Sequence, residues 1–136
     1  MINKITFGPA YKIASHNFQA GDILISFANS SGDHIEVSVE VPRFLVNCTS
    51  AQYPEEGEVF TEEMGRNLVE FLKARATKDK TSVFINCDHG EMRSASCAKA
   101  LKDFFNVPCF FIGNNTEVDP DVYCYRIYDS VLDALM

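Results

Sequence analysis

Short apolar runs separated by polar connections predict a set of β-strands along the chain. Five runs are rich in branched and aromatic residues and have strand length: 22–28, 35–39, 44–46, 82–86 and 109–112. The last three are nearly continuous in apolar residues, which is typical of central strands covered on both faces. The polar stretches 29–33, 50–58 and 77–80 are predicted to be surface connections.

Apolar positions at helical spacing predict three helices. Thr61 suits the N-cap of the first, Ser94 lies near the start of the second, and the third is expected to begin with Asp119 as N-cap and Pro120 as its first residue. The predicted inward faces are Met64, Leu68, Phe71 and Leu72 in the first helix, Cys97, Leu101, Phe104 and Phe105 in the second, and Cys124, Ile127, Tyr128, Val131 and Leu135 in the third. In the second helix, Lys99 and Lys102 are predicted to face outward.

Strand and helix alternate through the last 90 or so residues of this pattern, which predicts right-handed crossovers and a mostly parallel sheet flanked by helices. With 136 residues, of which 46% are apolar, the chain can bury one sizeable core. We therefore expect a single α/β domain over residues 1–136.

The net charge and the cysteines limit the partners, the compartment and the thiol chemistry that we expect for this domain. The net charge of −7 argues against a nucleic-acid or anionic-membrane partner, because both rely on many Lys and Arg side chains. No apolar run is long enough to span a bilayer, and the first residues lack the apolar segment of a signal peptide, so we expect a cytoplasmic protein. The five cysteines form no CxxC pair, which favours reduced thiols over a disulfide framework or a zinc ribbon.

One of these thiols stands where a strand meets a helix, in the stretch SVFINCDHGEMRSASCAKAL (residues 82–101). Backbone N–H groups and the positive end of the helix dipole converge at such a junction and suit a phosphate-sized anion. A thiolate at Cys87 is favoured there, and Arg93 can hold two oxygens of a phosphoryl group in a bidentate fork. Gly90 permits the backbone to turn its amides inward, and the Ser94 hydroxyl can donate to the sulfur.

The segment CDHGEMRS, residues 87–94, resembles the signature HC-x2-G-x2-R-[ST] of the protein tyrosine and dual-specificity phosphatases. The segments YKIAS, DILISFA, FTEEMGRNLVEFLKA and DPDVYCYRIYDSVLDAL are similar in pattern and order to compact members from bacteria and phages. The resemblance implies a metal-free and cofactor-free phosphatase with Cys87 as nucleophile, Arg93 as phosphate clamp and Ser94 as thiolate stabiliser. It also implies that Asp88, His89, Gly90, Glu91 and Met92 form the loop around the phosphate of a phosphorylated protein or small phosphate monoester.

Two departures from the family pattern affect the expected activity. Asn86 stands where the family usually has a histidine, and it can hydrogen-bond but adds no positive charge. The aspartate that protonates the leaving oxygen is missing, because no aspartate occurs between Asp33 and Asp79. At its expected place the chain has Asn47, Cys48 and Thr49, none of which is a competent acid at neutral pH. The carboxylates that can replace it are Glu55, Glu56, Glu58 and Glu91.

Other interpretations of these residues stay open. The domain can be an active phosphatase, a phosphate-binding pseudophosphatase, or an interaction protein that uses the fold as a scaffold. Cys97 and Cys48 are candidate resolving thiols for Cys87, although a buried structural cysteine is the commoner case. Metal binding by Cys87, Asp88 and His89 is disfavoured, since adjacent ligands in one tight loop rarely converge on a tetrahedral site. The sequence leaves the oligomeric state undetermined.

Overall fold

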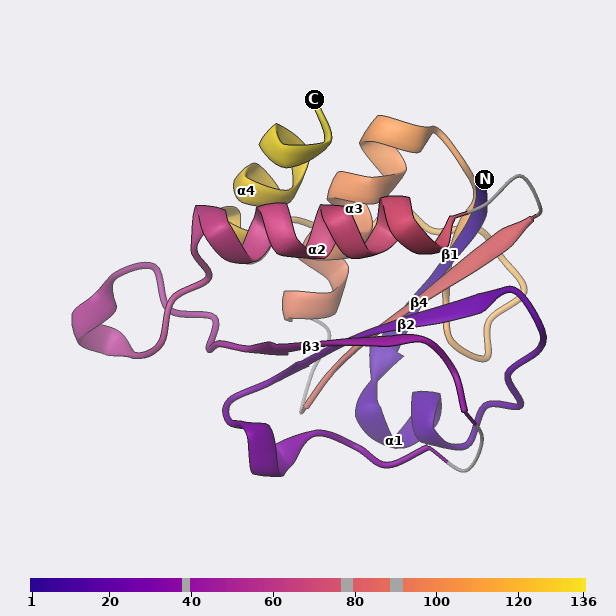
Figure 1. Ribbon diagram of the computed structural model, residues 1–136, viewed down its shortest axis with the longest axis horizontal. Helices are drawn as coiled ribbons and strands as arrows, with labels where there is room; N and C mark the ends of the chain where they lie inside the picture. Colours follow the sequence, from indigo (N-terminus) through magenta and orange to yellow (C-terminus); the bar gives the residue numbers. More distant parts are fainter. Residues whose placement is uncertain (38–39, 77–79, 89–91) are drawn as a thin grey trace.

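A parallel β-sheet forms the centre of the computed structural model of the protein, which describes residues 1–37, 40–76, 80–88 and 92–136 (Figure 1). Within these residues its strands are β1 (Ile2–Pro9), β2 (Asp22–Ala28), β3 (Arg43–Asn47), β4 (Thr81–Cys87) and β5 (Cys109–Phe111). Their order across the sheet is β3-β2-β4-β1-β5, and all neighbouring pairs are parallel. The prediction of one α/β domain with a mostly parallel sheet is confirmed.

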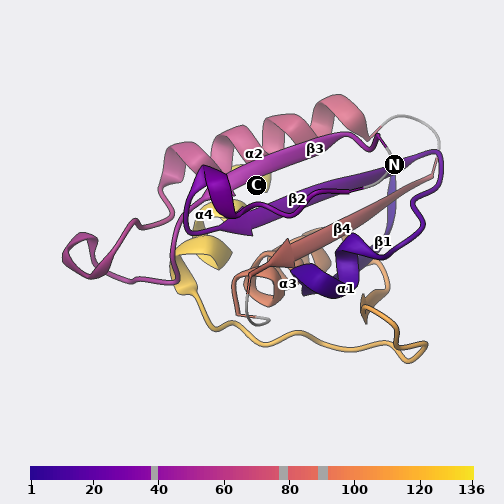
Figure 2. The ribbon, with the colours of Figure 1, turned by 90° about the horizontal axis from the view of Figure 1, so that it is seen from below.

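The helices lie on both faces of this sheet (Figures 1 and 2). α2 (Glu62–Arg75) and α3 (Met92–Phe105) pack on one face, and α4 (Tyr125–Leu135) packs against both of them. The short α1 (Ala10–Ala14) lies on the opposite face, against β1 and β4. This arrangement places β4 at the centre of the sheet, between β2 and β1, so that its carboxyl end lies among those of the other parallel strands.

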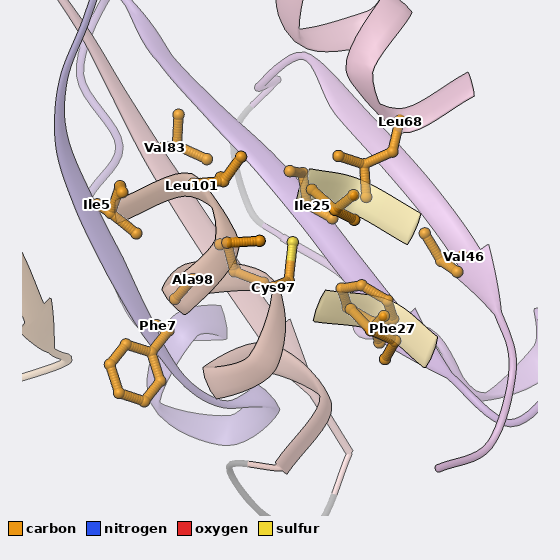
Figure 3. Close-up of a cluster of buried hydrophobic side chains, with 14 of the residues drawn as sticks. Ile5, Phe7, Ile25, Phe27, Val46, Leu68, Val83, Cys97, Ala98 and Leu101 are labelled. Atoms are coloured by element: carbon orange, nitrogen blue, oxygen red, sulfur yellow. The ribbon is translucent and has the colours of Figure 1, made fainter. Parts of the chain in front are cut away.

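The main core fills the space between the sheet and the helices α2, α3 and α4 (Figure 3). Ile25 and Phe27 of β2 meet Leu68 of α2 and Leu101 of α3, and these four side chains are completely buried. Burying side chains of this size contributes roughly 1.5–3 kcal/mol each. Cys97 lies in the same core beside these residues, so its thiol is part of the packing.

The strand predictions need correction at two places, one strand that was missed and one that is not formed. The sequence pattern missed β1, whose eight residues pair with β4 on one side and β5 on the other. The predicted strand 35–39 is not formed at 35–37, and 38–39 lie outside the described residues. Ile35 and Val37 instead pack over a smaller apolar cluster of Ile13, Leu24 and Phe84 on the α1 face of the sheet. The alternation of apolar and polar residues at 35–37 therefore arises because one side of this segment packs on the sheet, not because the segment pairs as a strand within it.

The helix predictions hold best for α2. The Thr61 hydroxyl accepts a hydrogen bond from the Met64 N–H at 3.1 Å, as expected of its N-cap. In α3, which begins at Met92 rather than near Ser94, the predicted inward residue Phe104 is 44% exposed.

The start of α4 was also predicted wrongly. The helix begins at Tyr125, with Cys124 as N-cap. The Asp119 carboxylate instead pairs with Lys99 and Lys102 of α3 through its Oδ1. The backbone N–H groups of Tyr123 and Cys124 are satisfied by the Ser96 hydroxyl at 3.1 and 2.8 Å.

Candidate functional site

Cys87 is the last residue of β4, the central strand, and its side chain is 2% exposed. Its Sγ lies 3.3 Å from Oγ of Ser94, which stands in the first turn of α3. The sequence predicted this pair, and the fold brings it together because β4 runs directly into α3. A hydroxyl at this distance can donate to a thiolate and stabilise it.

The first turn of α3 carries the other predicted site residues. Met92 is exposed, whereas Arg93 and Ser94 are buried beneath it. Asp88 is half-buried directly after the strand. His89, Gly90 and Glu91 lie outside the described residues. The described part of the site therefore consists of the two ends of the loop, with the N–H groups of a 14-residue helix beginning at its far end.

The guanidinium of Arg93 reaches across the carboxyl edge of the sheet. Its Nη1 donates to Oδ1 of Asn29, which follows β2, at 3.0 Å and to the backbone carbonyl of Cys48, which follows β3, at 2.5 Å. Both bonds use the same nitrogen. A guanidinium has five N–H donors in a fixed fork, and the donors on Nε and Nη2 have the geometry that a bidentate anion contact needs. Asn29 was not among the predicted site residues.

The other four cysteines are buried thiols with raised pKa values. Burial raises the pKa of Cys48 to about 12, although the nearby Arg93 charge opposes this change. Burial likewise raises the pKa of Cys109 to about 12 and increases the pKa of Cys97 and Cys124. These thiols are protonated at neutral pH, and Cys97 and Cys48 are poorly suited to attack another group.

Three of the candidate acids lie on the segment between β3 and α2. Glu55 and Glu56 belong to a short 3-10 turn (Pro54–Glu56) in the part that projects from the domain in Figure 1, and the Glu56 carboxylate accepts from the Tyr53 N–H. Glu58 lies at the base of the projection, because its carbonyl accepts from the N–H and hydroxyl of Thr49 at 2.7 and 3.0 Å. Glu58 is thus placed beside Cys48, whose carbonyl holds Arg93.

The base of this projection is tied to the start of α4. The Cys124 thiol lies 3.9 Å from the Ser50 carbonyl, and Nε of Arg126 donates to the Gln52 carbonyl. Ser96 in turn fixes Cys124 to α3. The segment that carries the candidate acids is therefore connected, through α4, to the helix that carries Arg93 and Ser94.

Neither a metal site nor a membrane span is found in the part of the chain that the structure describes. None of its His, Cys, Asp and Glu side chains gather in groups of three that could hold a metal ion. No helix within these residues is long and apolar enough to cross a bilayer.

Comparison with protein family models, curated proteins and solved structures gives no significant match. The phosphatase resemblance is therefore carried by the segment 87–94 and by its position between the central strand and α3.

Proposed function

We propose that this protein is a cysteine-dependent phosphatase that hydrolyses phosphate monoesters of proteins or small molecules. The observation that carries the proposal is the 3.3 Å contact between Sγ of Cys87 and Oγ of Ser94, at the junction of the central strand and α3. The buried Arg93 in the same helical turn supports it. The reaction needs no cofactor, and five free cysteines suit a reducing cytoplasm.

In the first step of this reaction, the Cys87 thiolate attacks phosphorus and the bond to the leaving oxygen breaks. The oxygen departs as an alcohol or phenol once it has taken a proton, and the phosphoryl group stays on sulfur. Water then attacks the cysteinyl phosphate, which releases inorganic phosphate and restores the thiolate. Ser94 stabilises that thiolate as it forms and leaves, and Arg93 with the α3 amides stabilises the charge on the phosphoryl oxygens.

Glu58 is the proposed donor of the proton to the leaving oxygen. Its position beside Cys48 brings it to the edge of the sheet that holds Arg93, whereas Glu55 and Glu56 lie farther out on the projection. Losing a general acid typically lowers the rate by about 10²–10⁴-fold.

A binding module without turnover is the second candidate function. The neutral Asn86 before the nucleophile and the missing aspartate favour it. Such a module would bind a phosphoryl group at Cys87 and Arg93 but release it unchanged.

Hydrolysis of p-nitrophenyl phosphate and of a phosphotyrosine peptide separates these functions. The phosphatase cleaves both, vanadate inhibits it, and Cys87→Ser abolishes turnover. Glu58→Gln lowers the rate on the peptide about a hundredfold and largely spares p-nitrophenyl phosphate, whose leaving group needs little protonation. Glu55→Gln and Glu56→Gln serve as matched controls and change neither rate. Phosphate binding without hydrolysis of either substrate would establish the binding module instead.

A further inference from the structure

Three polar side chains form a hydrogen-bonded row across β3, β2 and β4, next to Cys87. Nε of Arg43 donates to Oγ of Ser26 at 3.0 Å, and Oγ of Ser26 donates to Oδ1 of Asn86 at 2.7 Å. Ser26 and Asn86 are almost completely buried on the sheet. Asn86 immediately precedes Cys87, so this polar row ends one residue from the proposed nucleophile.

The Ser26–Asn86 hydrogen bond of this row lies at the last paired position of β2 and β4. Backbone pairing of these strands ends at Ser26 and Asn86. On the other side of β4, pairing with β1 continues one residue farther, to Cys87 opposite Pro9. The backbone of Cys87 is therefore paired on the β1 side but not on the β2 side, where Asn86 is the last paired residue, and the orientation of Asn86 affects the peptide that leads into Cys87.

Stability does not account for an arginine at the end of this row. Among the described residues, Nη2 of Arg43 has no hydrogen-bond partner although this atom is buried, while the residue as a whole is half-buried; burial lowers the pKa of the guanidinium. A buried donor without a partner costs about 1–3 kcal/mol. A half-buried charge that carries this cost, and that is joined by two hydrogen bonds to the residue before Cys87, points to a role in function.

We propose that Arg43 is a positioning residue for the phosphatase reaction. By holding the Ser26 hydroxyl, it fixes the Asn86 amide and the peptide that leads into Cys87, so that the sulfur is aimed at the bound phosphoryl group. The rate effects below rest on the proposed function, whereas the reactivity of Cys87 can be measured without it.

The deciding variant is Arg43→Met, which keeps the length of the side chain but removes the hydrogen bond and the charge. We expect kcat for p-nitrophenyl phosphate to fall at least tenfold with KM changed less than twofold, while Tm stays the same or rises. Arg66→Met is the matched control, because Arg66 is an exposed residue of α2 whose carboxylate partner is 4.0 Å away; it should change neither quantity. A lower Tm with unchanged kcat in Arg43→Met would overturn the proposal.

Ser26→Ala breaks the same row at its middle and keeps the proposal testable if Arg43→Met does not fold. Ser26→Ala should lower kcat to a similar extent. The double variant should be no slower than the slower single variant, because both substitutions break the same row of hydrogen bonds. Additive losses in the double variant, or full activity of Ser26→Ala, would contradict the proposal.

Alkylation of Cys87 by the neutral reagent iodoacetamide separates this proposal from the proposed function. Slower alkylation in Arg43→Met than in the wild type and in Arg66→Met supports the positioning role even if no substrate is turned over. Equal rates in all three proteins would rule that role out, whether or not the wild type is an active phosphatase.

Discussion

At the scale of single residues, the five thiols differ in what surrounds them rather than in exposure. All five are buried, and burial is the main cause of the raised pKa values of Cys48, Cys97, Cys109 and Cys124. Cys87 ends the strand that leads to α3 and lies beside the Ser94 hydroxyl of that helix. A cysteine reacts faster with an alkylating reagent when a larger fraction of its thiol is ionised to the thiolate. The proposed function therefore makes a prediction about which cysteine reacts first.

Cys87 should be carboxymethylated by iodoacetate faster than the other four cysteines at pH 6.5. A thiol whose pKa is about 12, as for Cys48, is almost entirely protonated at this pH. Phosphate or vanadate should slow the reaction at Cys87 because they occupy the same anion site. Peptide mass spectrometry over time measures the five rates. Equal rates among them, or no protection by either anion, would exclude Cys87 as the nucleophile.

The guanidinium of Arg93 gives the second prediction. Arg93→Lys keeps a charge but loses the planar fork, so it cannot bond Asn29 and the Cys48 carbonyl through one nitrogen while others make a bidentate contact with a phosphoryl group. We expect kcat/KM for p-nitrophenyl phosphate to fall about 10²–10³-fold, the usual cost of removing a transition-state donor. Far-ultraviolet circular dichroism should show an unchanged fold. Near wild-type turnover in Arg93→Lys would mean that the arginine does not contact the substrate.

Local spacing is enough to predict Cys87, Arg93 and Ser94, because all three belong to one strand–loop–helix segment. Asn29 and Arg43 carry no comparable signal, since their hydrogen bonds form only when segments distant in sequence come together at the sheet. Asn86 is intermediate: its position before the nucleophile is evident in the sequence, but its partner Ser26 lies 60 residues away.

At the scale of elements, the sequence predicts best where apolar periodicity is long. α2 has 14 residues and a capping threonine, and its predicted start and inward face agree with the structure. β1 was missed because polar residues interrupt its apolar pattern and because it ends in Gly8 and Pro9, which usually mark turns. The five residues of α1 have no side-chain cap and are too few for periodicity to show. The start of α4 is set by Ser96 of another helix, which no local pattern contains.

The crossing of α2 and α4 depends on the absence of a side chain at Gly65. A Cβ there would lie 2.8 Å from the carbonyl oxygen of Ser130 in α4 and 3.0 Å from its carbonyl carbon. Backbone atoms cannot move aside cheaply, so overpacking should cost about 1–3 kcal/mol, of which helix propensity returns up to about 1. We expect Gly65→Ala to lower the free energy of unfolding by about 1–2 kcal/mol in urea.

Gly32→Ala is the matched control for this experiment, because a Cβ at Gly32 meets no atom of the described residues within 4 Å. Its effect should stay within about 0.5 kcal/mol. A Gly65→Ala protein as stable as Gly32→Ala would show that the two helices can separate without cost.

At the scale of the whole molecule, one charged cluster holds α3, α4 and the segment before α4 together. Nζ of Lys99 lies 2.9 Å from carboxylate oxygens of both Asp103 and Asp119, and the Tyr128 hydroxyl donates to Asp103 at 2.5 Å. α4 and the segment before it also anchor the projection that carries Glu58. Loosening the cluster should therefore affect both stability and the proposed site.

The titration of this cluster predicts how stability depends on pH. Burial alone would raise the pKa of Asp103, but hydrogen bonds from Tyr128 and Lys99 outweigh it and hold this pKa below its ordinary value. The hydrogen bond from Lys99 lowers the pKa of Asp119 in the same direction. The unfolded carboxyl groups titrate near about pH 3.9. The stability that these two carboxylates contribute to the folded state is thus fully present above that pH. It is lost as the pH falls through their lower pKa values in the folded protein.

Asp103→Asn isolates this contribution. At pH 7 the variant should unfold with a free energy about 1 kcal/mol below that of the wild type, the value of one hydrogen-bonded and partly exposed charge, and 0.5 M salt should narrow the gap. The gap should close as the pH falls through the lowered folded-state pKa of Asp103, because the wild-type carboxyl group then becomes protonated as well. Asp133→Asn, on the exposed side of α4, is the control and should show no such dependence. A gap for Asp103→Asn that stays constant throughout an acid titration in urea would mean that its charge does not hold α4 to α3. The connection from α3 through α4 to the base of the projection would then depend on the contacts of Ser96, Cys124 and Arg126.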